Sequence, residues 1–278
     1  MNDYHESITT SFTCKLLYLG AMECAKYRMV RTDALSARIR IPVTALLIHH
    51  PAIGYIVYDT GNCENWQEEL FEDTRKNFPI VEYKSLQDAL AEEGLSPQDI
   101  DLLIMSHLHF DHAGSIRIFA GTKAGSHVLV GRKEYERACR VVEEGSGTAY
   151  VAEHFLVDGI RYEFLDEDRV LGDGLKIFLQ SSHSPAMLGL EICIPGERPL
   201  LCVSDSVYTQ ENYDTGQPPA SPNAANAEGF TENLVMLKKR QDEIGADILF
   251  GHDMAQVEDI LRRSGMCTEA NLNPEQTP

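Results

Sequence analysis

The sequence lacks any apolar run long enough to cross a membrane, and residues 1–14 contain no apolar core typical of a signal peptide. Basic residues are also scarce, because 24 Lys and Arg stand against 43 Asp and Glu, a formal net charge of −19. Nucleic acids and anionic membrane surfaces bind proteins through Lys and Arg. We therefore expect a cytoplasmic protein whose partner is neither a nucleic acid nor a membrane.

The seven cysteines form no Cys-x-x-Cys pair, and their odd number leaves at least one thiol unpaired. Cys193 and Cys202 lie inside strand-like runs, where a reduced thiol packs as a small hydrophobe, and this usage suits a reducing cytoplasm. The chain has 278 residues, 43% hydrophobic and 24% charged, as in an ordinary globular protein. We predict one domain over residues 1–265 and a loose polar tail at 266–278.

Apolar periodicity divides the chain into strands and helices. Alternating or continuous apolar runs predict strands at residues 13–19, 41–49, 54–59, 101–106, 126–130, 175–181, 188–194, 199–204 and 246–251. Patterns with a period of 3.6 predict helices near residues 64–77, 85–94, 132–144, 230–245 and 253–264. Early strands followed by alternating strands and helices indicate an α/β fold, the αββα sandwich, in which two mixed β-sheets pack together and helices flank them.

Three segments lack clear periodicity: residues 20–40, residues 144–160, and the Pro-, Ala- and Asn-rich residues 211–229. Loops of this length are uncommon in a compact domain unless they are functional or mobile. We predict that the first and the third segments form walls of a pocket. A surface loop without that role is the alternative for each.

The run His107-Leu108-His109-Phe110-Asp111-His112 follows the apolar segment 101–106 directly. It places three imidazoles and one carboxylate within six residues, a ligand set suited to a pair of divalent metals, with Zn²⁺ favoured and Fe or Mn as rivals. A strand end can aim His107 and His109 to one side, while Asp111 and His112 reach a second point. A lone histidine would more often be a core residue, but four ligand-type residues together predict a metal site.

Two metals need more donors than this run contains, and three further residues occupy comparable positions. His183, Asp205 and His252 each follow closely on an apolar, strand-like run. Taken singly, Asp205 or His252 could equally be a helix cap or a turn residue. Because all of these residues come at strand ends, we expect them to converge on one rim of an α/β structure.

These motifs resemble those of the metallo-β-lactamase-fold hydrolases, and among them the N-acyl-homoserine lactonases, or quorum-quenching lactonases. The resemblance spans about residues 12–262, and its strings are Ser106 to Gly114, Asp205 to Asn212, Phe250 to Asp253, Ile41-Pro42-Val43 and Tyr58 to Gly61. It implies an αββα sandwich and a hydrolase that opens a lactone ring by attack of a hydroxide bridging two Zn²⁺ ions. Such a hydroxide is available at neutral pH because metal ions lower the pKa of bound water.

The resemblance also assigns roles to individual residues. His107, His109 and His183 would hold the first metal. Asp111, His112 and His252 would hold the second metal, and Asp205 would bridge the two. Asp111 would in addition carry a proton to the leaving alkoxide. Tyr208 matches the residue that donates a hydrogen bond to the substrate, although an aromatic residue more often only packs. Asp59 would orient one imidazole from behind, and a plain turn aspartate is the equal alternative.

One motif departs from the family pattern. The usual Gly-His-(Ser/Thr)-x-Gly-His is here Ser182-His183-Ser184-Pro185-Ala186-Met187, which keeps the ligand His183 but replaces the second histidine with Met187. Met187 and Phe110 are therefore predicted to lie in the wall of the substrate pocket. The expected substrate is an N-acyl-homoserine lactone. Another lactone, an ester or a phosphotriester remains open, as do a non-catalytic metal-dependent binder and a homodimer.

Overall fold

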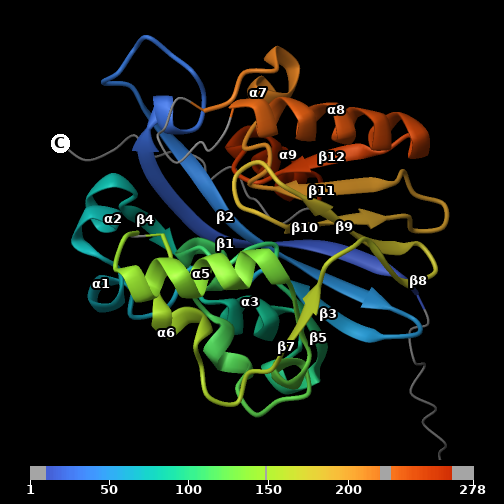
Figure 1. The fold of residues 1–278 in the computed structure, drawn as a ribbon. Helices are drawn as coiled ribbons and strands as arrows, with labels where there is room; N and C mark the ends of the chain where they lie inside the picture. Colours follow the sequence, from blue (N-terminus) through green and yellow to red (C-terminus); the bar gives the residue numbers. More distant parts are fainter. Residues whose placement is uncertain (1–10, 148, 220–226, 265–278) are drawn as a thin grey trace, which may run out of the picture.

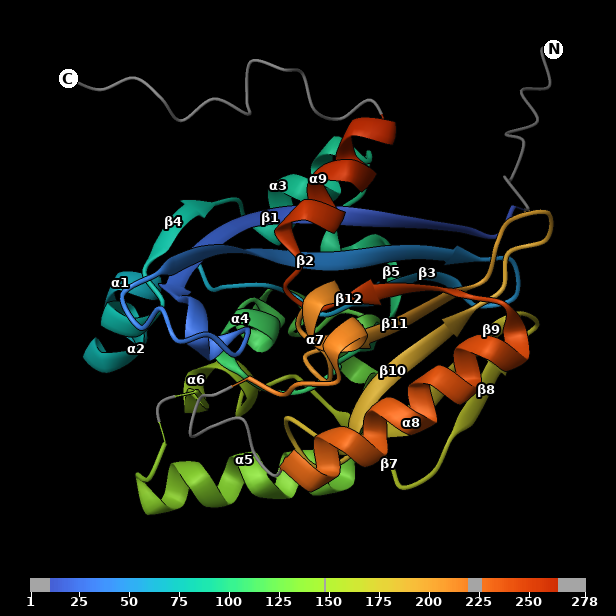
Figure 2. The same cartoon turned by 90° about the horizontal axis from the view of Figure 1, so that it is seen from above.

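The computed structural model describes residues 11–147, 149–219 and 227–264, and its chain folds into two β-sheets that lie face to face with helices on their outer surfaces (Figure 1). Turned by 90°, the long strands of one sheet run above those of the other, and helix α8 lies along the outside of the second sheet (Figure 2). The predicted αββα sandwich is confirmed. The predicted tail at 266–278 lies outside the described residues, and the single domain over 1–265 stays a prediction.

The first sheet has seven strands, of which β1 and β2 form a long antiparallel pair and β3, β5, β6 and β7 run parallel to one another. Their spatial order is β4 (Ile80–Tyr83), β1 (Thr13–Ala25), β2 (Arg38–His50), β3 (Gly54–Tyr58), β5 (Ile100–Ile104), β6 (Val128–Gly131) and β7 (Tyr162–Leu165).

The second sheet has five strands, all antiparallel to their neighbours except the parallel pair of β11 and β12. Their spatial order is β12 (Asp247–Phe250), β11 (Leu200–Ser204), β10 (Met187–Ile192), β9 (Leu175–Gln180) and β8 (Arg169–Gly172).

Among the described residues, no helix is both long and apolar enough to span a membrane. Ser85, Thr209 and Asp253 begin α3, α7 and α9 by accepting a backbone N–H with their side chains, which satisfies donors left free at a helix start. The α-helices are α1 (Trp66–Glu69), α2 (Glu72–Asn77), α3 (Leu86–Glu92), α4 (Phe110–Ala113), α5 (Arg132–Glu144), α6 (Ala152–Phe155), α7 (Gln210–Thr215), α8 (Ala227–Ile244) and α9 (Met254–Arg263). The short 3₁₀ helices are η1 (Lys26–Arg28), η2 (Pro97–Asp99), η3 (Ile116–Phe119) and η4 (Ala124–Ser126).

Apolar side chains are sorted into three buried clusters that correspond to the layers of the sandwich. Strand β5 shows the sorting: Leu103 faces the helices of the first sheet, whereas Leu102 and Ile104 face the second sheet. In β11, Cys202 lies between the sheets, and Val203 packs under α8. Successive strand residues point to opposite faces, so each inner strand contributes to two cores at once. This double burial explains the nearly continuous apolar runs seen in the sequence.

The predicted strands and helices are present, with the predicted helix at 64–77 divided into α1 and α2, but the strands β4, β7 and β8 were missed. Each of the three is only four residues long and forms one edge of its sheet. Edge strands are exposed on one side, and these contain charged residues such as Glu82, Glu163 and Arg169, so their apolar periodicity is weak. The segment 20–40 was also misjudged in part, because β1 continues to Ala25 past a register shift that begins at Tyr18.

Two loops at the end of the first sheet are joined by close backbone contacts. The N–H and the hydroxyl of Thr60 both donate to the carbonyl oxygen of His112, at 2.7 and 2.8 Å. Gly114 lies so close to the other loop that a Cβ there would stand 2.4 Å from the backbone nitrogen of Cys63. The loops 59–63 and 111–115 therefore form one rigid unit.

We predict that Gly114→Ala lowers the free energy of unfolding by about 1–3 kcal/mol, the usual effect of forcing extra volume into a packed site. Gly114 has φ −57°, so the effect would be steric and not conformational. Urea unfolding of the metal-free protein would measure it, with Gln87→Ala on the exposed side of α3 as the control. A change within about 0.5 kcal/mol would contradict the rigid contact between the loops.

Candidate metal centre

The first sheet supplies four of the predicted ligands from a single strand end. Strand β5 leads through Met105 and Ser106 into a loop that carries His107 and His109, and α4 begins directly after His109. Asp111 and His112 are in this one-turn helix. The short helix turns the chain back, so these four side chains face a common region.

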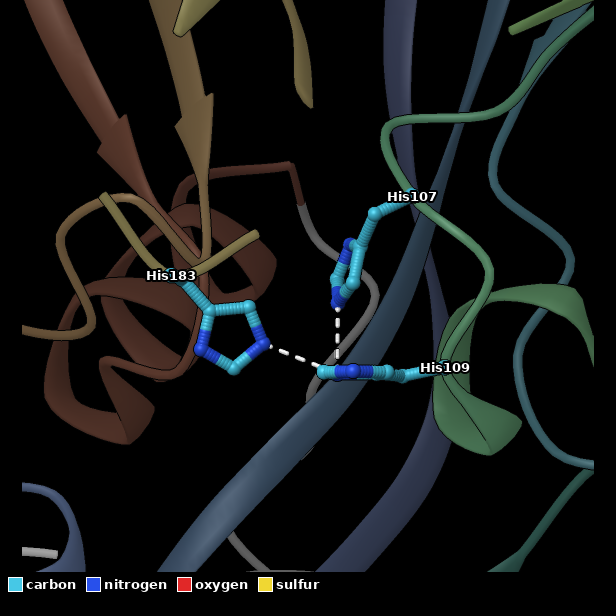
Figure 3. A group of neighbouring side chains, drawn as sticks. All are labelled: His107, His109 and His183. Carbon is cyan, nitrogen blue, oxygen red and sulfur yellow. Dashed lines mark hydrogen bonds between the residues drawn. The ribbon is translucent and has the colours of Figure 1, made fainter. Parts of the chain in front are cut away.

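The second sheet supplies the remaining predicted ligands. His183 lies in the loop between β9 and β10, Asp205 directly follows β11, and His252 follows β12. Figure 3 shows the imidazole of His183 pointing across the gap between the sheets toward His107 and His109. All seven predicted ligands are thus brought to one place by two sheets.

Three imidazoles form the first triad. The Nε2 atom of His107 lies 3.1 Å from Nδ1 of His109, and Nε2 of His183 lies 2.8 Å from the same Nδ1 (Figure 3). The rings of His107 and His183 are nearly perpendicular, at 85°. Three ring nitrogens that converge from different directions can bind one metal ion.

Asp111, His112 and His252 form the second triad. Asp111 Oδ2 lies 3.6 Å from Nε2 of His252 and 3.8 Å from Nε2 of His112. All three side chains are buried.

The carboxylate of Asp205 lies between the two triads. Its Oδ2 atom is 3.2 Å from His252 Nε2, 3.6 Å from His183 Nε2 and 3.8 Å from His107 Nε2. Its Oδ1 atom is 3.2 Å from His112 Nε2. One carboxylate can therefore contact ions in both triads.

The donor set fits divalent cations. Burial and the neighbouring imidazoles hold the pKa of His107 and His109 well below the usual histidine value, so both rings carry free lone pairs at neutral pH. His112 Nε2 and Asp205 Oδ1 are buried and lie 3.2 Å apart, and neither atom makes a well-aligned hydrogen bond within the part of the chain that the structure describes. Buried polar atoms without partners are rare, and a coordinated ion would satisfy both.

Electrostatics point the same way. Despite its burial, the carboxyl of Asp205 has a pKa well below its ordinary value, because His252 and His112 lie beside it, so it is ionised. Asp59 and Asp111 are also buried here. Buried carboxylates need a counter-charge, and divalent cations would supply it.

A model of the metallo-beta-lactamase superfamily matches residues 39–252 of this sequence. The chain belongs to the metallo-beta-lactamase superfamily. It is 27% identical over 259 residues to the N-acyl homoserine lactonase AttM of Agrobacterium fabrum, an alignment that covers 88% of this chain and 94% of that relative.

This superfamily member is also 29% identical over 250 residues to an N-acyl homoserine lactonase of Bacillus thuringiensis, with 87% of this chain and 94% of that relative covered. Among solved structures, it is similar to an N-acyl homoserine lactone hydrolase with the product N-hexanoyl-L-homoserine bound at the catalytic metal centre. The TM-score is 0.77, the sequences are 26% identical, and 90% of this chain and 96% of that chain are covered.

Polar groups behind the candidate ligands contact the second ring nitrogen of two imidazoles and hold these rings in place. Asp59 Oδ2 lies 2.8 Å from His112 Nδ1, and the Asp59 carboxylate accepts the N–H and the hydroxyl of Ser106, both at 2.7 Å. His252 Nδ1 lies 3.0 Å from the carbonyl oxygen of Pro42. Partners of this kind orient metal-binding histidines and select their tautomer. The structure thus places Asp59 against an imidazole, where it was expected.

Backbone strain gathers at the same place. Asp59, Ala186 and Ser204 have positive φ values of 63°, 55° and 46°, and among the described non-glycine residues no others do. Each lies at a strand end that carries or supports a candidate ligand. Such strain persists only where the surrounding packing enforces it, and it is typical of functional sites.

Tyr208 lies at the edge of the first triad. Its hydroxyl is 2.8 Å from His183 Nδ1, and its ring packs between His183 and His252. A small cavity of about 20 Å³ lies beside it, lined partly by Pro218, Pro219 and Phe230. This agrees with the expectation that the segment 211–229 contributes to a pocket wall, although Gln210–Thr215 forms α7 and residues 220–226 lie outside the described residues.

That Phe110 and Met187 line the substrate pocket stays a prediction, and both side chains are buried in the described structure. Phe110 is buried in the core between the first sheet and its helices, where its ring lies 6.3 Å from that of Phe78. Met187 is fully buried as the first residue of β10. Neither side chain lines the two small cavities that border the triads.

Sequence reasoning missed Glu134, Tyr150 and Ser184. Glu134 is fully buried, and it accepts hydrogen bonds from the Tyr150 hydroxyl and from Ser184. Burial raises the pKa of Glu134 to about 7. In sequence, this residue resembles an ordinary acid in the first turn of a helix, which faces solvent and favours the helix dipole. The sequence contains no signal that separates the two cases.

A separate group of ligand-type side chains, Cys63, Glu69 and His154, also lies within 4.8 Å. Here both oxygens of Glu69 accept hydrogen bonds from the guanidinium of Arg117, at 2.9 and 2.5 Å. Because the guanidinium already neutralises this carboxylate, we assign no metal to the group.

We predict that His109→Ala and Asp205→Ala each lower the number of metal ions bound per chain, because each removes a donor that faces several others. Elemental analysis of the purified proteins would measure this. His127→Ala is a matched control, since His127 is exposed just before β6 and, among the described side chains, pairs with Glu163 at 3.1 Å. Full metal content in both site variants would exclude these residues as ligands.

Proposed function

We propose that this chain is a metal-dependent hydrolase that opens the lactone ring of N-acyl-homoserine lactones, with two Zn²⁺ ions per chain. The observation that carries the proposal is the convergence of five imidazoles and two carboxylates at one buried point between the sheets. Imidazole nitrogen and carboxylate oxygen suit Zn²⁺, although Fe or Mn could use the same donors. The similarity to lactonases over most of the chain supports the choice of substrate.

In this proposal, the first ion is held by the first triad, the second by the second triad, and Asp205 contacts both. When bound, such ions supply a water-derived nucleophile at neutral pH and polarise the carbonyl group of the substrate. The protein contributes the fixed positions of the donors. It also limits the access of bulk water, because five of these seven side chains are buried.

Tyr208 is proposed to donate a hydrogen bond to the substrate. If His183 Nε2 holds the first ion, the neutral ring carries its proton on Nδ1 and would donate it to the Tyr208 oxygen, which lies 2.8 Å away. The phenol proton is then free for the carbonyl or ring oxygen of the lactone. Burial raises the pKa of Tyr208 well above its usual value, so the phenol stays protonated and acts as a donor.

Asp111 is proposed to carry the proton to the leaving alkoxide. Its carboxylate is in the second triad, and no hydrogen bond from another described side chain fixes it. A carboxylate in this position can take a proton from the nucleophile and return it to the ring oxygen after cleavage. A cytoplasmic location and a homodimer remain predictions, which rest on the cysteine content and on the frequency of dimers.

The substrate can be tested with a pH-stat screen of lactones, esters and phosphotriesters, run together with metal analysis of the same sample. We expect about two metals per chain and acid release from N-acyl-homoserine lactones. Two metals with turnover of another class would replace the lactone with that substrate. Two metals with bound but unchanged ligand would favour the non-catalytic binder.

We predict that Tyr208→Phe retains its metals but lowers kcat by roughly 10- to 1,000-fold, the range found when one oriented donor or acid is removed. Steady-state kinetics on the best lactone would measure the change. Tyr55→Phe is the control, since Tyr55 lies near the start of β3, packs against His49 and is at the end of the strand away from Asp59. An unchanged kcat would remove Tyr208 from the mechanism.

A further inference from the structure

One buried carboxylate reaches both loops that carry the first triad. Glu134 is the third residue of α5, and its side chain is fully buried. Its Oε1 atom accepts the backbone N–H of Leu108 at 2.9 Å. Leu108 is the residue between His107 and His109, so this bond holds the peptide that connects two of the three imidazoles.

The other oxygen of Glu134 holds the third imidazole's loop. Oε2 accepts the hydroxyl of Ser184, which directly follows His183, and the hydroxyl of Tyr150 at 3.1 Å. The Tyr150 ring in turn packs edge-on against His109, with the ring centres 4.5 Å apart and an angle of 64°. Glu134 therefore contacts the surroundings of every imidazole in the first triad: it binds the peptide between His107 and His109 and the residue after His183.

The backbone brings α5 unusually close to the loop of His183. A Cβ placed on Gly131, the residue before α5, would stand 1.8 Å from the carbonyl oxygen of Ala186. Ala186 ends the loop in a left-handed conformation, with φ 55°. Only a glycine permits this approach, and the approach puts Glu134 within reach of Ser184.

Packing alone does not explain a carboxylate at this position. Glu134 takes part in no ion pair among the side chains that the structure describes, so its burial is costly, and an apolar side chain of similar size would fill the space. What the carboxylate adds is three aimed hydrogen bonds. The second triad has its own support from Asp59 and the carbonyl oxygen of Pro42, and Glu134 bonds to neither.

We propose that Glu134 is a positioning residue for the first triad, an inference that rests on the proposed metal centre. It clamps the loop of His107 and His109 to the loop of His183 and so sets the spacing of the three ring nitrogens. The second triad is independent of this clamp. The inference concerns metal affinity at one of two neighbouring sites, and it can be tested without measuring turnover.

The test compares the two triads separately by Zn²⁺ competition with a chromogenic chelator. His252→Ala leaves the first triad intact, and His183→Ala leaves the second intact. Glu134→Gln, added to each, keeps the shape of the side chain but removes its charge and one acceptor. We expect Zn²⁺ affinity to fall about 10- to 100-fold in the His252→Ala background, the usual effect of losing a partner behind a ligand, and to stay unchanged in the His183→Ala background.

Leu90→Ala is the control for a merely structural effect. Leu90 is fully buried under the first sheet on α3, so this change weakens folding without touching either triad. It should leave both affinities unchanged even where its thermal unfolding matches that of Glu134→Gln. If Glu134→Gln does not fold, Ser184→Ala, which removes a single hydrogen bond of the clamp, decides the question with the same expected selectivity.

The outcomes separate the inference from the proposed function. Equal weakening at both triads, or no weakening at the first, would overturn the role of Glu134 and leave the lactonase proposal intact. Two tightly bound ions without lactone turnover would overturn only the lactonase proposal. A wild-type chain that binds no divalent metal would overturn both.

Discussion

The burial of several ionised and ionisable groups between two sheets is the constraint on which the rest of this structure depends. Five imidazoles and the carboxylates of Asp59, Asp111 and Asp205 lie where water is largely excluded, and such groups are stable only if fixed donors or cations compensate for lost hydration. The hydrogen bonds behind the ligands supply part of that compensation. His112 Nε2 and Asp205 Oδ1 lie 3.2 Å apart without a well-aligned hydrogen bond among the described residues, and a divalent cation between the donors would complete the compensation.

The αββα sandwich is well suited to this task because each sheet carries part of the donor set. Strand ends of the first sheet bring His107 to His112, and those of the second bring His183, Asp205 and His252. The core between the sheets, formed by residues such as Ile104 and Leu190, holds the two halves in fixed relation. Close-packed interiors have low compressibility, so the hydrophobic core sets the distances among the polar atoms at its edge. The residues with positive φ at the strand ends store backbone strain, which accompanies the inward direction of the neighbouring side chains.

How far the sequence predicted the structure depended on how local each feature is. The helix at 132–144 was predicted with its observed bounds, because a periodic apolar face and a following glycine are local signals. The edge strands β4, β7 and β8 were missed because their pairing, and not their own pattern, makes them strands. Met187 was assigned to a pocket because it replaces a histidine of the family motif, and the structure shows Met187 and Phe110 as buried side chains. In the fold, a single position along a strand or helix decides whether a side chain faces a cavity or the core.

By itself, the sequence determined the chemistry of the centre. The dense His107–His112 run and single donors after three later strands specify nitrogen and oxygen ligands suited to divalent metals, and that information lies in residue type and short spacing. The family resemblance had suggested the two triads, the position of Asp205 between them and the role of Asp59, but only the tertiary structure supplied the distances among these atoms and the further groups that hold the imidazoles. Glu134 shows the difference most clearly: as the third residue of a helix it has an ordinary sequence context, and it becomes part of the centre only because α5 packs against the loop of His183. Contacts between segments far apart in the chain depend on the packing of whole sheets and helices, which no local pattern encodes.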